Sequence, residues 1–144
     1  MSAHQKVHSF LLDIFTRINK IEERTLATGL DFEISISEIH IIDVIGASGS
    51  VRISDIARAL HVTLATITVA CERLERRDLI TRTRGQKDKR VVLVSLTPKG
   101  EAAYQFHESF HHNLIDSALA DLTQEEQDQL ASALEKIEGF LTQY

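Results

Sequence analysis

The chain has 144 residues, of which 43% are hydrophobic, with a formal net charge of −5 and one cysteine. This length predicts one domain with its own core, and the lone cysteine excludes an intramolecular disulfide and fits a reducing compartment. No apolar run approaches the ~20 residues of a membrane span, and the N-terminus lacks the apolar segment of a signal peptide. We therefore expect a cytoplasmic protein with no membrane partner.

Charge is divided unevenly along the chain. Residues 52–90 carry ten basic and five acidic side chains, a local charge of +5, and the rest of the chain carries −10. Local potential, rather than total charge, steers a protein onto phosphate groups. The middle of the chain is therefore expected to meet nucleic acid, while the two ends face something else.

The first third of the chain is predicted to be helical. Apolar residues spaced by three and four predict a helix over residues 5–28, which Gly29 ends. Ser35 and Glu38 have the spacing of a capping box for a second helix, which continues to about Ala47.

A helix-turn-helix is predicted next. Arg52 and Ile53 add a short strand, and Ser54 is expected to cap a helix over residues 55–60. A tight turn at residues 61–63 then leads into a helix over residues 64–77.

The last elements are a hairpin and two helices. Two runs of alternating or β-branched residues flank a charged tip that contains Gly85, which predicts a β-hairpin. Thr97 and Pro98 predict the start of a long helix that ends near Leu122. Thr123 begins a second capping box, which predicts the last helix.

These elements predict a mainly α fold with a small β-wing, a winged helix-turn-helix. We expect residues 1–144 to form a single domain in which residues 35–97 are the DNA-binding lobe and residues 1–30 and 98–144 are dimerisation helices. The terminal helices are apolar along faces that a small core cannot cover. They pack on each other within one chain or, as we expect, join two copies into a homodimer that reads a palindromic site in double-stranded DNA.

The helix over residues 64–77 is the predicted recognition helix. Ile67, Ala70, Cys71 and Leu74 form one stripe that should face the core. The other face is small, apolar and rich in threonine, which suits thymine methyl groups and phosphates better than a solvated surface. The residues expected to contact DNA here are Thr63, Leu64, Ala65, Thr66, Thr68, Val69 and Arg73.

The hairpin identifies a family resemblance. Asp88-x-Arg90, a hydrophobic strand and Leu96-Thr97-Pro98-Lys99-Gly100 resemble the signature of the MarR family of bacterial transcription regulators, as do residues 62–68 and 74–80. Asp78 departs from the pattern because the family usually has glycine there, but aspartate tolerates a left-handed turn.

The resemblance assigns roles in the wing. It implies that Arg90 enters the minor groove and that Asp88 orients it, since an aspartate facing phosphate is costly unless it positions an arginine. The other basic residues expected to contact phosphate are Arg52, Arg58, Arg84, Lys87 and Lys89.

Histidines in the penultimate helix raise two alternatives. His107-Glu108-Ser109-Phe110-His111 spells H-E-x-x-H, the motif of zinc peptidases, but its context after a DNA-binding wing leaves a metal-dependent hydrolase as a remote alternative, and we expect no enzyme. Some zinc-responsive MarR-family repressors use similarly placed histidines, which here are His40, His107 and His111. Our primary expectation is that there is no cofactor and no metal, with zinc as the alternative.

Residues 36–46, 62–64 and 89–92 are similar to one subgroup, the fatty-acid biosynthesis repressors of low-GC Gram-positive bacteria. The resemblance implies long-chain acyl-acyl carrier protein as a corepressor, held where the first, second and fifth helices meet. The plain alternative is that the same side chains are only core. The candidate lining residues are Phe15, Ile18, Phe32, Ile34, His40, Ile41, Phe106, His107, Phe110 and His111.

Overall fold

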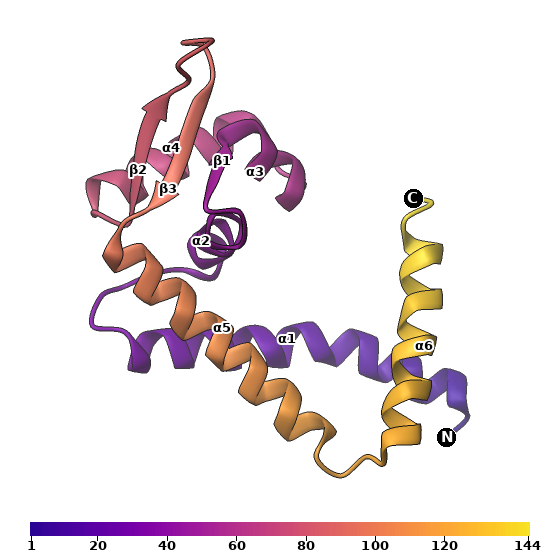
Figure 1. The fold of residues 1–144 in the computed structure, drawn as a ribbon. Helices are drawn as coiled ribbons and strands as arrows, with labels where there is room; N and C mark the ends of the chain where they lie inside the picture. The colour runs from indigo at the N-terminus through magenta and orange to yellow at the C-terminus, as the bar shows by residue number, and fades with distance from the viewer. The chain divides into compact units, whose positions relative to one another are not determined.

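The computed structural model describes residues 1–144 and confirms a mostly helical chain with a small wing (Figure 1). The sheet is antiparallel with the strand order β1-β3-β2, so β3 lies between its two neighbours. The elements in chain order are α1 (Ala3–Gly29), α2 (Ile36–Ser48), β1 (Ser50–Arg52), α3 (Ile53–Leu60), α4 (Leu64–Arg76), β2 (Ile80–Arg84), β3 (Val92–Leu96), α5 (Pro98–Leu119) and α6 (Gln124–Leu141).

The chain divides into two compact units, Met1–Ser109 and Phe110–Tyr144, with the boundary inside α5. The first unit contains the hydrophobic core. Most of its fully buried side chains come from α2, α3, α4 and the sheet, and include Ile42, Ile56, Leu74 and Val94. Helix α2 is apolar on nearly every side because other elements of the lobe surround it.

Capping boxes begin three helices. The box of α2 is as predicted, since the Ser35 hydroxyl accepts from the Glu38 backbone N–H and the Glu38 carboxylate accepts from the Ser35 backbone N–H. Helix α6 begins with the predicted box at Thr123. Helix α1 begins earlier than predicted because Ser2 and Gln5 form a third box.

The predicted cap of α3 at Ser54 is wrong. Helix α3 begins at Ile53, its N-cap is Arg52, and no side chain caps it. The reason is the strand before it: β1 pairs with β3 as far as Arg52 opposite Leu93, so the chain passes from strand to helix without a free capping residue.

The motif at residues 96–100 ties the start of α5 to the end of α4. Asp78 adopts the expected left-handed conformation, with a φ of 60°, and its carbonyl accepts a hydrogen bond from the Thr97 hydroxyl at 2.6 Å. The same hydroxyl accepts from the Gly100 backbone N–H at 3.1 Å, so Thr97 caps α5 as predicted. A Cβ at Gly100 would lie 2.0 Å from the Leu79 carbonyl oxygen, which is why glycine is required there.

Helix α5 ends at Leu119 and not near Leu122 as predicted. The Leu122 backbone N–H donates to the Leu119 carbonyl and closes a turn after the helix. No single helix has the length and apolar character to cross a membrane. Only α3 and α4 taken as a pair, bent by 116°, pass the same test of length and composition.

Candidate nucleic-acid interface

Helix α4 presents one buried and one exposed face. The predicted stripe of Ile67, Ala70, Cys71 and Leu74 is buried. Because it is buried, the pKa of the Cys71 thiol rises to about 11, so the thiol stays protonated at neutral pH. On the opposite face, Thr68 is half-buried and the remaining predicted contact residues are exposed, namely Thr63, Leu64, Ala65, Thr66, Val69 and Arg73.

The threonine hydroxyls of this face are engaged by their own helix. Thr63 caps α4 by accepting from the Thr66 backbone N–H, and the two hydroxyls lie 2.8 Å apart. The Thr68 hydroxyl donates to the Leu64 carbonyl at 2.8 Å. The face therefore offers mainly methyl groups, with Arg73 as its only cation, and this chemistry suits thymine methyl groups in a major groove.

The wing tip is braced by its own backbone and by one arginine. Gly85 and Val91 close the loop through a 2.8 Å backbone hydrogen bond, and the Arg84 guanidinium donates to the Lys89 carbonyl at 2.9 Å. Asp88 accepts from the Arg90 backbone N–H at 2.9 Å and from its Nε at 3.4 Å. The Arg90 side chain is 94% exposed, so the structure brings these two predicted residues together while leaving the guanidinium open to a ligand.

Ion pairs inside the lobe engage some of its cations. Arg58 pairs with Asp55 at 3.1 Å, Arg77 with Glu38 at 2.9 Å, and Arg82 with Glu75 at 3.0 Å. Sequence reasoning missed the last two pairs because their members come from different elements. The predicted phosphate contacts with no ion pair inside the chain are Arg52, Arg84, Lys87 and Lys89, and all four are exposed, as is Arg73 of the recognition helix.

Four of the candidate effector residues line two cavities of the first unit. Phe32 and Ile34 line a cavity of about 690 Å³ whose charged lining is Glu23, Glu33, Glu38 and Arg77. The effector pocket itself stays a prediction.

The second cavity, of about 590 Å³, lies between α2 and α4. His40 and Ile41 line it together with Ile67 and Ala70, and Arg73 stands among its polar residues. The remaining candidates do not line either cavity. Phe15 is exposed on α1, Ile18, Phe106, Phe110 and His111 are half-buried, and His107 is fully buried.

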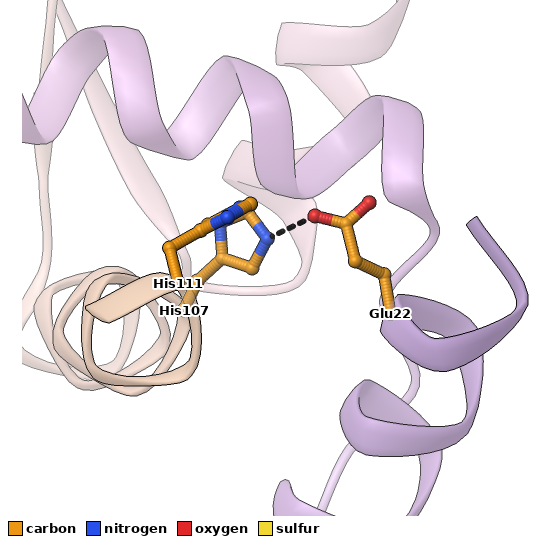
Figure 2. A group of neighbouring side chains, drawn as sticks. All are labelled: Glu22, His107 and His111. Atoms are coloured by element: carbon orange, nitrogen blue, oxygen red, sulfur yellow. Dashed lines mark hydrogen bonds and ion pairs between the residues drawn. The ribbon is translucent and has the colours of Figure 1, made fainter. Parts of the chain in front are cut away.

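His107 forms a buried charge cluster with two carboxylates. Its Nε2 is hydrogen-bonded to Glu22 of α1, as the dashed line in Figure 2 shows. That distance is 2.9 Å, and Nδ1 lies 2.8 Å from Asp43 of α2. Burial lowers the pKa of His107, but the hydrogen bonds and charges of Asp43 and Glu22 outweigh it, so the net pKa is raised. His111 follows one turn later on the same helix.

The arrangement around His107 resembles that of a metal-binding histidine. A histidine that ligates through one nitrogen commonly donates from the other to a carboxylate, as His107 does to Asp43. The donor atoms of His107 and His111 lie within 4.8 Å of each other. The third predicted ligand, His40, has its ring centroid 6.0 Å from that of His107.

A helix-turn-helix whose second helix exposes a methyl-rich face, followed by a wing with an exposed arginine, defines a winged-helix DNA-binding protein. The profile of the MarR family matches residues 34–92, which run from before α2 into β3. The chain belongs to the MarR family.

Individual relatives support the same assignment. The structure of FabT from Streptococcus pneumoniae in complex with DNA is similar with a TM-score of 0.92 and 34% identity, over 97% of this chain and 98% of that chain. The transcriptional repressor MdtR of Bacillus subtilis is 27% identical over 94% of this chain and 88% of its own length. The regulator BilQ of Clostridium symbiosum is 30% identical over 72% of each chain.

The protein is therefore a DNA-binding transcriptional regulator and not an enzyme. The first histidine of the H-E-x-x-H sequence in α5 is held by Glu22 and Asp43.

Proposed function

We propose that the protein is a cytoplasmic, homodimeric repressor that binds a palindromic operator in double-stranded DNA. The observation that carries the proposal is the shared exposure of the α4 face and Arg90 on one lobe. An α-helix with a methyl-rich face suits the major groove, and an exposed arginine on a narrow hairpin suits the minor groove. The exposed cations around them supply the contacts to phosphate.

The dimer is supported by apolar side chains that each unit leaves exposed. Helix α1 exposes Val7, Phe10 and Phe15, and helix α6 exposes Leu134 and Phe140. Exposed apolar faces of this extent mark sites of association, and a two-fold dimer matches a two-fold operator. A second copy of the chain is the occupant we propose for both faces.

We propose long-chain acyl-acyl carrier protein as corepressor and fatty-acid biosynthesis genes as the regulated set. The motif resemblance and the similarity to FabT favour this assignment. The larger cavity disfavours an anionic ligand, because Glu23, Glu33 and Glu38 line it and its one arginine, Arg77, is already paired with Glu38. Its apolar lining, which includes Phe32 and Ile34, is the part that suits an acyl chain. The carrier protein is strongly acidic, so it would dock on the basic lobe.

The test is an operator gel shift with purified untagged protein. Long-chain acyl-acyl carrier protein is expected to raise operator affinity, whereas unacylated carrier protein and salicylate are expected to have little effect. If the protein binds operator and random DNA equally at every salt concentration, the proposed repressor function itself fails. No effect of the acylated carrier at any chain length would remove only the lipid assignment.

A second candidate, zinc-responsive repression, is favoured by the geometry of α5. His107 and His111 bring imidazole nitrogens close together, and Glu22 and Asp43 supply the carboxylates that a zinc-binding histidine uses. Glu22, His107 and His111 would hold the ion. Elemental analysis, together with operator binding in the presence of zinc or of a chelator, separates the two candidates. Equimolar zinc whose removal abolishes DNA binding would favour the zinc-responsive repressor.

A further inference from the structure

Arg82 in β2 is held by the recognition helix. The Glu75 carboxylate accepts from the Arg82 Nε at 3.1 Å and from the Arg82 backbone N–H at 3.2 Å, and it lies 3.0 Å from Nη2. Glu72, one turn earlier in α4, lies 3.9 Å from Nη1. A single carboxylate thus fixes both the backbone and the side chain of the strand.

The position of the Glu75–Arg82 contact along the hairpin affects how far the wing tip can move. Arg82 pairs with Val94 in the middle of the hairpin, and the basic tip projects beyond this pair. At about 3.3 Å per residue, Gly85 at the base of the tip is ~10 Å farther along the strand. A small rotation of β2 at Arg82 therefore becomes a larger displacement of Arg90 relative to α4.

The two glutamates are unfavourable for DNA binding as simple charges. They lie on the helix that meets DNA, where negative charge repels phosphate. The hydrogen bond to Arg82 lowers the pKa of Glu75, so the carboxylate is ionised and the pair is formed at neutral pH. Because Arg82 is paired with Glu75, it is also less available for contact with phosphate.

We propose that Glu75 and Arg82 are positioning residues that set the direction of the wing relative to the recognition helix, and thereby the preference for operator over other DNA. Binding in two grooves at once requires Arg90 and the α4 face to keep a fixed relation. Phosphate contacts, in contrast, tolerate a moving wing. The inference rests on the operator binding proposed above.

The experiment compares Glu75→Gln with wild type on an operator and on random DNA of the same length. Loss of a negative charge beside phosphate, by itself, tightens binding to both DNAs. The proposal instead predicts that operator affinity falls about fivefold, the scale of a good ion pair, while affinity for random DNA is unchanged or higher. Glu101→Gln is the control, because it removes one negative charge from an exposed site on α5.

Two further variants separate positioning from folding. Arg82→Lys keeps the charge but cannot reproduce the contacts of Nε and Nη2 with Glu75, so it is expected to lose specificity in the same direction. The double variant Glu75→Arg with Arg82→Glu restores an ion pair and is expected to recover part of the preference. Urea denaturation of each variant shows whether it is folded.

The inference is overturned if a folded Glu75→Gln variant binds the operator as tightly as wild type or more tightly. It is also overturned if Glu75→Gln and Arg82→Lys lose as much affinity for random DNA as for the operator. If wild type itself shows no operator preference, the proposed function fails. If wild type shows the preference and both single variants keep it, only the positioning role fails.

Discussion

Arg90 at the wing tip and His107 in α5 are both basic side chains held by carboxylates, but the first side chain is 94% exposed and the second is 1% exposed. Exposed pairs contribute little to stability, so Asp88 orients Arg90 without removing it from solvent or from DNA. A buried pair is costly to break because each charged group has already lost its hydration. The same chemistry therefore gives a binding group at the wing and a structural connection between α1, α2 and α5.

The largest predicted effect is on the buried cluster. His107→Ala removes the hydrogen bond that Glu22 accepts in a buried site, and it should lower the free energy of unfolding by about 3 kcal/mol. Urea denaturation in the presence of a chelator measures this loss. Asp13→Ala, which breaks the exposed Arg17–Asp13 contact of 3.9 Å, is the control and should change stability by less than about 0.5 kcal/mol. Equal losses in the two variants would contradict the distinction between buried and exposed pairs.

The next effect is on the exposed arginine. Arg90→Ala should weaken operator binding by about 1–3 kcal/mol, the scale of a specific contact, and leave the urea midpoint unchanged. Fluorescence anisotropy on a labelled operator measures it, with Lys20→Ala of α1 as a charge-matched control. If operator affinity does not change, the assignment of the wing tip is wrong.

A smaller effect is expected for the orienting carboxylate. Asp88→Ala should weaken operator binding less than Arg90→Ala, because Asp88 acts through its hydrogen bonds to Arg90. In a double-mutant cycle, Asp88→Ala should add little in the Arg90→Ala background. Additive losses would show that Asp88 has a separate role.

The smallest effect is the acid dependence of the Glu75–Arg82 pair. The hydrogen bond with Arg82 lowers the pKa of the Glu75 carboxyl below its ordinary value of 4.5. The stability that this shift contributes is present above that value and is lost as pH falls through the lowered pKa. Glu75→Gln should therefore flatten the loss of stability at acid pH slightly, measured by urea midpoints. An unchanged acid profile would show that the pair is too solvent-screened to matter.

Local patterns predicted the exposed region well. The α4 stripe, the start of α4 at Leu64 and the turn at Asp78 all follow from residues close together in sequence, and the structure confirms them. The cap at Ser54 failed because the pairing of Arg52 with Leu93, distant in sequence, decides where α3 begins.

Local patterns could not predict the buried cluster around His107. His107 meets Asp43 and Glu22 across 64 and 85 residues, so no spacing within one helix indicates the cluster. The candidate effector residues depend on where the first, second and fifth helices meet, which local spacing does not define. Only tertiary packing separates Phe32, which lines the larger cavity, from His40, which lines the smaller.

The most direct test of the central claim is the affinity for a palindromic operator and for random DNA as salt increases. A dimer that places exposed cations on phosphate and α4 in the major groove should lose affinity steeply with salt on both sequences, and should prefer the operator by about 10³-fold or more. Arg90→Ala should reduce that preference. Weak, salt-independent binding, or equal affinity for both sequences at every salt concentration, would contradict the account.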